Sequence, residues 1–123
     1  MAWNIKYNCD HKIIEITYSG IVSPSELNDA LAAAMSLSQK ECTLLVLADC
    51  TDIAGGHSVT DLFFLISLYE KHGLRGMKEA LILPALKSSI DQVLFYETAC
   101  LNRGFNVKIL RNSQEAIAWL KEG

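Results

Sequence analysis

The chain has 123 residues, a length that fits one domain with a buried core. Half of the residues are hydrophobic, a fifth are charged, and the formal net charge is −3 with no cluster of lysine and arginine. This balance is typical of a globular domain. It argues against nucleic acid and anionic membrane surfaces as partners, because both bind clustered basic side chains. We expect a single domain over residues 1–123.

The four cysteines are widely scattered and lack the Cys-x-x-Cys spacing of metal sites and thioredoxin-type redox sites. The first residues contain no apolar signal segment, and no stretch is long enough to insert into a bilayer. The sequence therefore predicts a cytoplasmic protein with reduced thiols, no metal and no cofactor.

The first third of the chain predicts a hairpin and a helix. Residues 2–8 and 12–19 alternate between apolar and polar side chains, and the short turn between them favours an antiparallel pair at a sheet edge. Ser23 suits a helix N-cap, Pro24 the first helical position and Glu26 the glutamate of a capping box. We expect this helix to end near residue 39.

The middle of the chain predicts the central strand. Residues 44–48 are apolar throughout, as in a parallel strand buried on both faces. A loop from Asp49 to Ser58 and a helix over residues 59–72 follow. The carboxyl ends of parallel strands are where functional loops gather in open α/β folds.

The last third predicts a strand over residues 80–83, a helix from about Ser88 to Arg103, a strand over residues 105–110 and a short helix capped by Asn112. The order of elements is therefore ββαβαβαβα. It predicts an α/β fold with a five-stranded, mostly parallel sheet, an N-terminal hairpin and about four helices.

This order, the strand end Asp49-Cys50-Thr51-Asp52-Ile53 and the closing Ala116-Ile117-Ala118-Trp119-Leu120 resemble the SpoIIAA-like family. That family comprises bacterial STAS-related domains, also grouped with Sec14-like lipid-binding folds. The anti-sigma-factor antagonists among them carry a phospho-acceptor serine nine residues after the strand-end aspartate, within Asp-Ser-Ser-Gly. The same count from Asp49 gives Ser58, although His57 replaces the aspartate and Val59-Thr60 replace Ser-Gly.

We expect any ligand or partner to contact the loop between the central strand and its helix. Its two glycines let backbone amides approach a ligand, and its last residue opens a helix whose unpaired amides attract acceptor groups. The candidate contact residues are Asp49, Asp52, Gly55, Gly56, His57 and Ser58. Ser58 is also the candidate phospho-acceptor, and with Asp61 at N3 it suits a helix N-cap.

No catalytic residue is predicted. Cys50 and His57 have the types of a nucleophile and a base, but a free cysteine after an apolar strand more often packs as a small buried side chain. Turns and caps explain the aspartates equally well. Glu97 falls within the apolar arc of its helix and would need a partner there.

The helix over residues 59–72 predicts a partner surface. One broad apolar arc, formed by Val59, Leu62, Phe63, Leu65, Ile66 and Tyr69, would cover the sheet. Phe64 and Leu68 lie outside that arc, one turn apart. Two aligned apolar side chains on an exposed face indicate a protein interface, with a homodimer as the first candidate.

The sequence thus favours a non-enzymatic binding or regulatory module. Two alternatives stay open: a Sec14-like carrier of a hydrophobic small molecule, and a hydrolase-like enzyme at the Asp49–Ser58 loop. A dry apolar cavity of several hundred Å³ would favour the carrier, whereas a filled core with an apolar helix face would favour the module.

Overall fold

A computed structural model describes residues 2–122 and contains a five-stranded sheet in the order β1-β2-β3-β4-β5. β1 and β2 are antiparallel, and every later pair is parallel. The strands are β1 (Trp3–Asn8), β2 (Ile13–Gly20), β3 (Leu45–Ile53), β4 (Lys78–Ile82) and β5 (Asn106–Leu110). The predicted edge hairpin and the predicted central strand are both confirmed.

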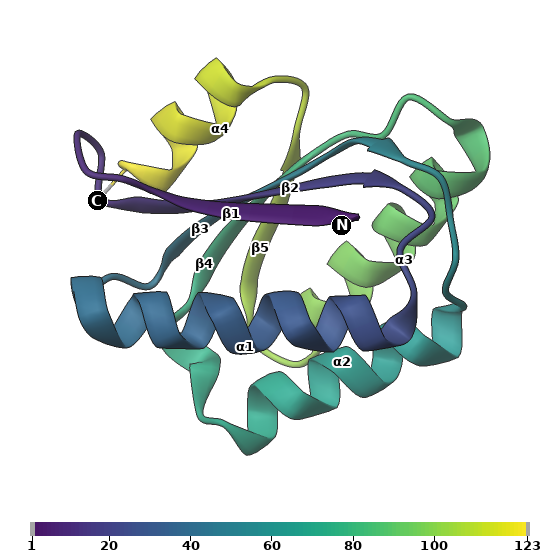
Figure 1. Cartoon of the computed structure of the whole chain (residues 1–123), viewed down its shortest axis with the longest axis horizontal. Coiled ribbons are helices and arrows are strands. Elements are labelled where there is room, and N and C mark those ends of the chain that lie inside the picture. The colour runs from purple at the N-terminus through teal and green to yellow at the C-terminus, as the bar shows by residue number, and fades with distance from the viewer. Residues whose placement is uncertain (1, 123) are drawn as a thin grey trace.

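Helices cover both faces of this sheet, but unequally (Figure 1). Three long helices lie against one face and the short C-terminal helix lies against the other. The helices are α1 (Pro24–Glu41), α2 (Val59–Lys71), α3 (Lys87–Asn102) and α4 (Ser113–Leu120), with a short 3-10 helix η1 (Leu74–Gly76) after α2. The larger of the two cores therefore lies between the sheet and the three long helices.

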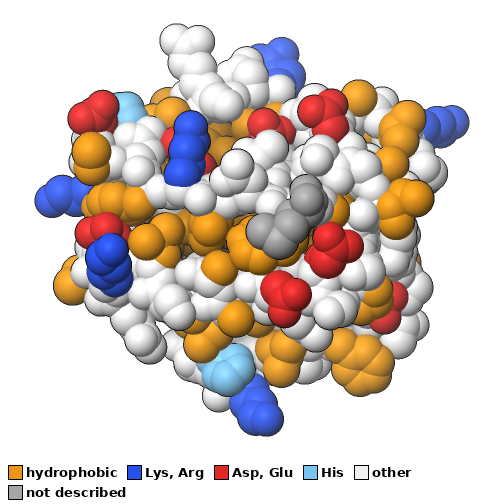
Figure 2. All heavy atoms as spheres, viewed as in Figure 1, with side chains coloured by type: hydrophobic (Ala, Val, Ile, Leu, Met, Phe, Trp, Pro, Cys, Tyr) orange, Lys and Arg blue, Asp and Glu red, His pale blue; other side chains and the backbone are white. Residues whose placement is uncertain are grey.

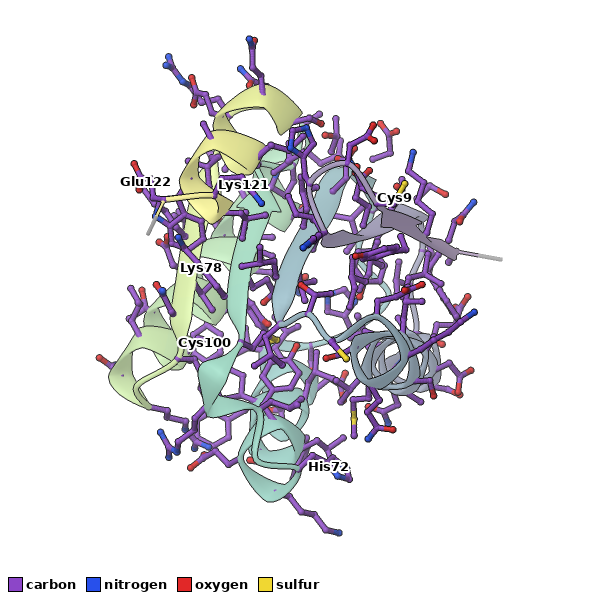
Figure 3. All side chains as sticks on the ribbon, turned by 90° about the vertical axis from the view of Figure 1, so that its left-hand side faces the viewer. Cys9, His72, Lys78, Cys100, Lys121 and Glu122 are labelled. Carbon is purple, nitrogen blue, oxygen red and sulfur yellow. The ribbon has the colours of Figure 1, made fainter. Side chains whose placement is uncertain are left out.

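The helix starts follow the capping chemistry of the sequence. Ser23 and Glu26 form the predicted capping box of α1, and the Asn112 side chain accepts from the Glu115 amide at α4. The other end of α4 is held by Lys78, whose ammonium donates to the Trp119 carbonyl at 2.6 Å and lies 4.5 Å from the centre of that residue's ring. Figure 3 shows Lys78 beneath the end of this helix.

Two strands extend beyond their predicted bounds. β3 continues through Ile53, so the strand-end residues predicted as loop are strand, because β2 keeps pairing with β3 after an irregularity: Ser19 pairs with Asp52 and Gly20 with Ile53. β4 begins at Lys78, which pairs with both Leu45 and Asn106. Neighbouring strands supply these extra pairs, and the local sequence pattern does not reveal them.

The predicted apolar arc of α2 was wrong at two positions. Leu62, Leu65, Ile66 and Tyr69 are buried as expected, whereas Val59 and Phe63 are exposed. Of the two residues predicted to face solvent, Phe64 is exposed and Leu68 is half-buried. The sheet and α3 contact α2 along a narrower strip than the helical wheel suggested, so more apolar surface is left uncovered.

Within residues 2–122 no helix is long and apolar enough to cross a membrane. Acidic and basic side chains are interspersed on the face shown in Figure 2, with hydrophobic side chains between them. Of the four free cysteines, Cys9 and Cys42 are exposed and Cys50 and Cys100 are buried. Figure 3 shows Cys100 inside the molecule and Cys9 at the outer hairpin.

Candidate functional site

The stretch that connects β3 to α2 is held against the chain's own backbone. The Gly55 carbonyl accepts from the Val22 amide at 2.8 Å, and Nδ1 of His57 lies 2.8 Å from the Val22 carbonyl oxygen. A Cβ on Gly56 would lie 2.5 Å from Ile21 Cγ2 and 2.8 Å from the Val22 amide nitrogen. In this structure the close backbone approach at these glycines is to the segment after β2. We call residues 54–58 the 54–58 loop.

Ser58 caps α2 as predicted. Its hydroxyl accepts from the Asp61 amide at 3.1 Å, and the Asp61 carboxylate accepts from the Ser58 amide at 2.7 Å. That backbone hydrogen bond is the main reason that the pKa of Asp61 is lowered. Ser58 is exposed to solvent, so its hydroxyl is accessible but already engaged in a reciprocal cap.

The two aspartates of the predicted site do not join the loop. Asp49 accepts from the Thr51 amide at 3.0 Å and from the Thr51 hydroxyl at 2.6 Å, a local turn-like arrangement within β3. Because strand side chains alternate between faces, Asp49 points away from the face on which Ala48 and Cys50 contribute to the larger core. Asp52 is exposed. Of the six predicted contact residues, Asp49 therefore lies on the opposite face of the sheet from the larger core.

A pocket opens between the sheet and α2 and α3. About 50 Å³ within it admits the centre of a water-sized sphere. It is lined mainly by apolar and tyrosyl side chains from β2, β3, β4 and the helices, with His57 and Gln92 among the few other polar ones. The side-chain amide of Gln92 donates to the backbone carbonyl of His57 at 3.0 Å, and this hydrogen bond connects α3 to the 54–58 loop.

A carboxyl that the sequence analysis overlooked lies in this pocket. Glu79, the second residue of β4, is only 6% exposed, and its Oε1 accepts from the Tyr96 hydroxyl at 2.5 Å. The Tyr69 hydroxyl lies 2.8 Å from that of Tyr96. Since Tyr96 uses its single hydrogen on Glu79, Tyr69 donates to Tyr96. The result is a buried chain of two hydroxyls that ends on a carboxyl.

Burial controls the protonation of this chain. Desolvation raises the pKa of Glu79 from 4.5 to about 7, although the hydrogen bond from Tyr96 acts in the opposite direction. Desolvation also raises the pKa of Tyr69 and that of Tyr96 well above the ordinary value, and the nearby Glu79 adds to both shifts. Among these three hydrogen-bonded side chains, the Glu79 carboxyl is therefore the one that titrates near neutral pH.

The geometry gives no support to a thiol nucleophile. Cys50 is buried, and its thiol lies 3.8 Å from the Ala48 carbonyl oxygen. Desolvation raises the pKa of Cys50, and the charge of Glu79 raises it further. A reactive cysteine needs the opposite shift, towards the thiolate. His57 lines the same pocket, but its Nδ1 is engaged with the Val22 carbonyl.

Glu97, singled out from the sequence, has a structural partner. Its Oε2 accepts from the Ile109 amide at 2.9 Å, so this α3 side chain satisfies a backbone donor of the edge strand β5. Among residues 2–122 no group of three histidine, cysteine or acidic side chains is arranged to hold a metal ion.

The sequence carried little signal for Glu79. It precedes an apolar run that predicts a strand only from residue 80, so the glutamate falls in the preceding loop. Its burial follows from pairing, because Val46 of β3 and Val107 of β5 lie opposite it and extend β4 backwards. An acidic residue directly before an apolar run would be the only local hint, and most such residues are exposed.

Comparisons with known proteins support the fold and leave the function open. No protein-family model matches the chain, and no curated protein matches it in sequence. A crystal structure of an uncharacterized DUF3478 family protein with a SpoIIAA-like fold, from Shewanella loihica PV-4, is similar with a TM-score of 0.66. The two share 18% sequence identity over 97% of this chain and 92% of that one. The fold of this chain is SpoIIAA-like, as the sequence indicated.

Proposed function

We propose that this chain is a non-enzymatic regulatory module that binds a protein partner through apolar side chains of α2 and α3. The observation that supports this most directly is the uncovered outer surface of these helices. Phe64 is 66% exposed, and the other large exposed apolar side chains of the two helices are Val59, Phe63, Leu94 and Leu101. Exposed aromatic side chains among other exposed apolar side chains are typical of protein–protein interfaces.

A groove connects the two helices within this surface. About 190 Å³ of it admits the centre of a water-sized sphere, and it is lined by Phe63 of α2, by Phe95 of α3 and by Arg103, which caps the end of α3. The Arg103 guanidinium lies 4.2 Å from the centre of the Phe63 ring. Aromatic and arginine side chains dominate the binding energy of many protein interfaces. We call Phe63, Phe64, Phe95 and Arg103 the α2–α3 patch.

The first partner to consider is a second copy of the chain. Charges of both signs border the α2–α3 patch, because Glu70 pairs with Arg75 at 3.2 Å and with Arg103 at 2.5 Å. A two-fold-related copy would present the same apolar surface to the first copy. The charges beside this surface are already paired within each copy, so each copy would present an apolar centre with a neutralised polar rim.

The two alternatives from the sequence receive less support. A carrier of a hydrophobic molecule needs a dry apolar cavity of several hundred Å³, whereas the pocket at Glu79 is narrow and contains a buried carboxyl. A hydrolase at the Asp49–Ser58 stretch needs an activated nucleophile. Cys50 is a buried thiol with a raised pKa, and Ser58 is engaged with Asp61.

Sedimentation analysis of Phe64→Lys tests the proposal. The parent protein should self-associate as its concentration rises. The Phe64→Lys variant should remain monomeric at concentrations where the parent is dimeric. The substitution should leave the fold intact, because Phe64 is absent from the buried core. Leu44→Lys is the matched control. Leu44 is, like Phe64, a large apolar residue exposed to solvent, but it lies just before β3 and outside both helices.

Two results would contradict this proposal. A parent protein that stays monomeric at high concentration excludes the second copy as partner. Equal loss of association in Phe64→Lys and Leu44→Lys would place the contact outside the α2–α3 patch.

A further inference from the structure

We propose that the pocket in front of β4 binds a small protonated amine with a short apolar body, whose ammonium group contacts the free oxygen of Glu79. This site differs from the α2–α3 patch, because none of the patch residues lines the pocket. It is also independent of the proposed protein-binding function, since it uses the inner rather than the outer sides of α2 and α3.

The unused oxygen of Glu79 points to a ligand. Oε1 accepts from Tyr96, while no other side chain or amide within residues 2–122 donates to Oε2. The Glu79 residue is 94% buried. Among the described residues, however, every fully enclosed side-chain nitrogen or oxygen atom has a hydrogen-bond partner, so an oxygen without a partner is not fully enclosed. Oε2 therefore keeps some accessible surface, and Glu79 lines this pocket as well as a smaller one beside α1. A buried carboxylate oxygen that faces a cavity requires a donor.

The surroundings favour a cation over a neutral donor. Three tyrosines, Tyr18, Tyr69 and Tyr96, line the pocket beside Glu79, and aromatic rings attract organic cations. Among residues 2–122, no lysine or arginine lines the pocket to neutralise the carboxylate. An ammonium group would offset the cost of ionising Glu79 in this setting, because a nearby opposite charge stabilises the charged form. An anion would meet repulsion.

The volume limits the size of the ligand. A water molecule needs roughly 10–15 Å³ of such space, so the available 50 Å³ accommodates about four atoms of that size. Leu62, Leu65, Leu81 and Val93 supply the apolar wall around the short carbon chain. Propylammonium, with four non-hydrogen atoms, matches this description and serves as the probe. 1-Propanol has nearly the same shape without the charge, and propionate carries the opposite charge.

The experiment is a titration of the full chain with each probe, followed by backbone amide chemical shifts. Propylammonium should bind at least tenfold more tightly than 1-propanol at pH 8, with shifts confined to residues that line the pocket, and propionate should not bind there. Glu79→Gln should reduce the affinity for propylammonium at least tenfold and leave that for 1-propanol almost unchanged. Glu97→Gln is the control, because Glu97 is a half-buried carboxylate that contacts β5 and does not line the pocket.

The pH dependence supplies a second readout. Ionised Glu79 binds the amine, so affinity should rise about tenfold between pH 6 and pH 8 as the carboxyl loses its proton. The other titratable groups around it are Tyr18 of β2, Cys50 of β3, Tyr69 of α2, and Tyr96 and Cys100 of α3, all with raised pKa values that keep them neutral in this range. His57 of the 54–58 loop also lines the pocket. Glu79→Gln serves as the control for every other titratable group around the pocket.

Several outcomes would overturn the proposal. One is equal affinity for propylammonium and 1-propanol, which would make the pocket a general apolar site. Another is a Glu79→Gln protein that is folded and binds the amine as the parent does, with the same pH dependence. Shifts confined to another surface would place any amine binding outside this pocket.

Discussion

The 54–58 loop and the β4 wall of the pocket differ in where their polar groups find hydrogen-bond partners. The loop is rich in glycine and polar residues, follows the central strand and opens a helix, yet its hydrogen-bonding groups contact Val22, Gln92 and Asp61 of the same chain. The β4 wall belongs to an apolar strand, yet it presents a buried carboxyl with a free oxygen to a pocket.

We infer from this comparison that a polar group left without a partner in the fold is a better guide to a site than a polar stretch of sequence. A polar loop can complete its hydrogen bonds locally, and then its composition reports only how the backbone turns. A single acidic residue within a buried strand has few hydrogen-bond donors near it, and a carboxyl oxygen without a donor indicates where a ligand could bind. Four pairs of substitutions test this contrast.

Gly56→Ala should have the largest effect on stability, about 4 kcal/mol. Its φ of +97° is strained for any residue with a Cβ, and that atom would overlap the backbone of Val22. Gly55→Ala has a φ of +87° but no atom within 4 Å of the added carbon, so it should cost about 1–2 kcal/mol. Urea denaturation of both variants measures the difference. Equal costs would mean that the loop is not pinned against the segment after β2.

Glu79→Gln should remove a pH dependence of stability. The folded-state pKa of Glu79 is about 7 against an ordinary 4.5, so the folded protein holds a proton that the unfolded chain releases. The parent should therefore lose about 3 kcal/mol of stability as the pH rises from about 4.5 to 7, and little more above that. The glutamine variant should not lose it, so its advantage should be greatest above pH 7.

Denaturation at pH 4 and pH 8 measures this linkage. At pH 4 both proteins carry a neutral group at residue 79 and should differ little in stability. Parallel curves for the two proteins across this range would show that the carboxyl is not buried as described. Glu97→Gln provides the comparison for a carboxylate that already accepts a backbone hydrogen bond.

Tyr96→Phe should cost about 2 kcal/mol, because it removes the donor to Glu79 and leaves the Tyr69 hydroxyl without its acceptor. Tyr69→Phe breaks only the second of these hydrogen bonds and should cost about half as much. The loss in Tyr96→Phe should be greater at pH 8 than at pH 5, since the ionised carboxylate depends more on the donor. Equal costs for the two variants would mean that the hydroxyls do not form a chain to Glu79.

Ser58→Ala should have the smallest effect, about 1 kcal/mol, through loss of the cap on α2. Ser58→Asp retains a side chain that can cap the helix, so it should be the more stable of the two at low salt. The pair also tests the phospho-acceptor hypothesis. If Ser58 regulates the partner, Ser58→Asp should alter self-association in sedimentation while Ser58→Ala retains it; identical association of both with the parent would leave Ser58 as a cap alone.

The elements of this chain were largely predictable because their signals are local. The Ser23 and Ser58 caps, the alternation in the hairpin and the wholly apolar central strand each depend on residues that are neighbours in sequence. The order of these elements then restricts the topology to few choices. The result was the SpoIIAA-like sheet with the hairpin at its edge.

Only the tertiary structure placed the site residues, because their environments depend on contacts between distant segments. Pairing with β3 and β5 extended β4 and buried Glu79, while Tyr96 of α3 donates to Glu79 and Tyr69 of α2 donates to Tyr96. Packing against α3 decided which apolar residues of α2 stay exposed. Burial depends on the whole fold, and desolvation by burial shifts the pKa of Glu79. Local sequence therefore determined the helices and strands, whereas tertiary packing determined the protonation of the carboxyl between them.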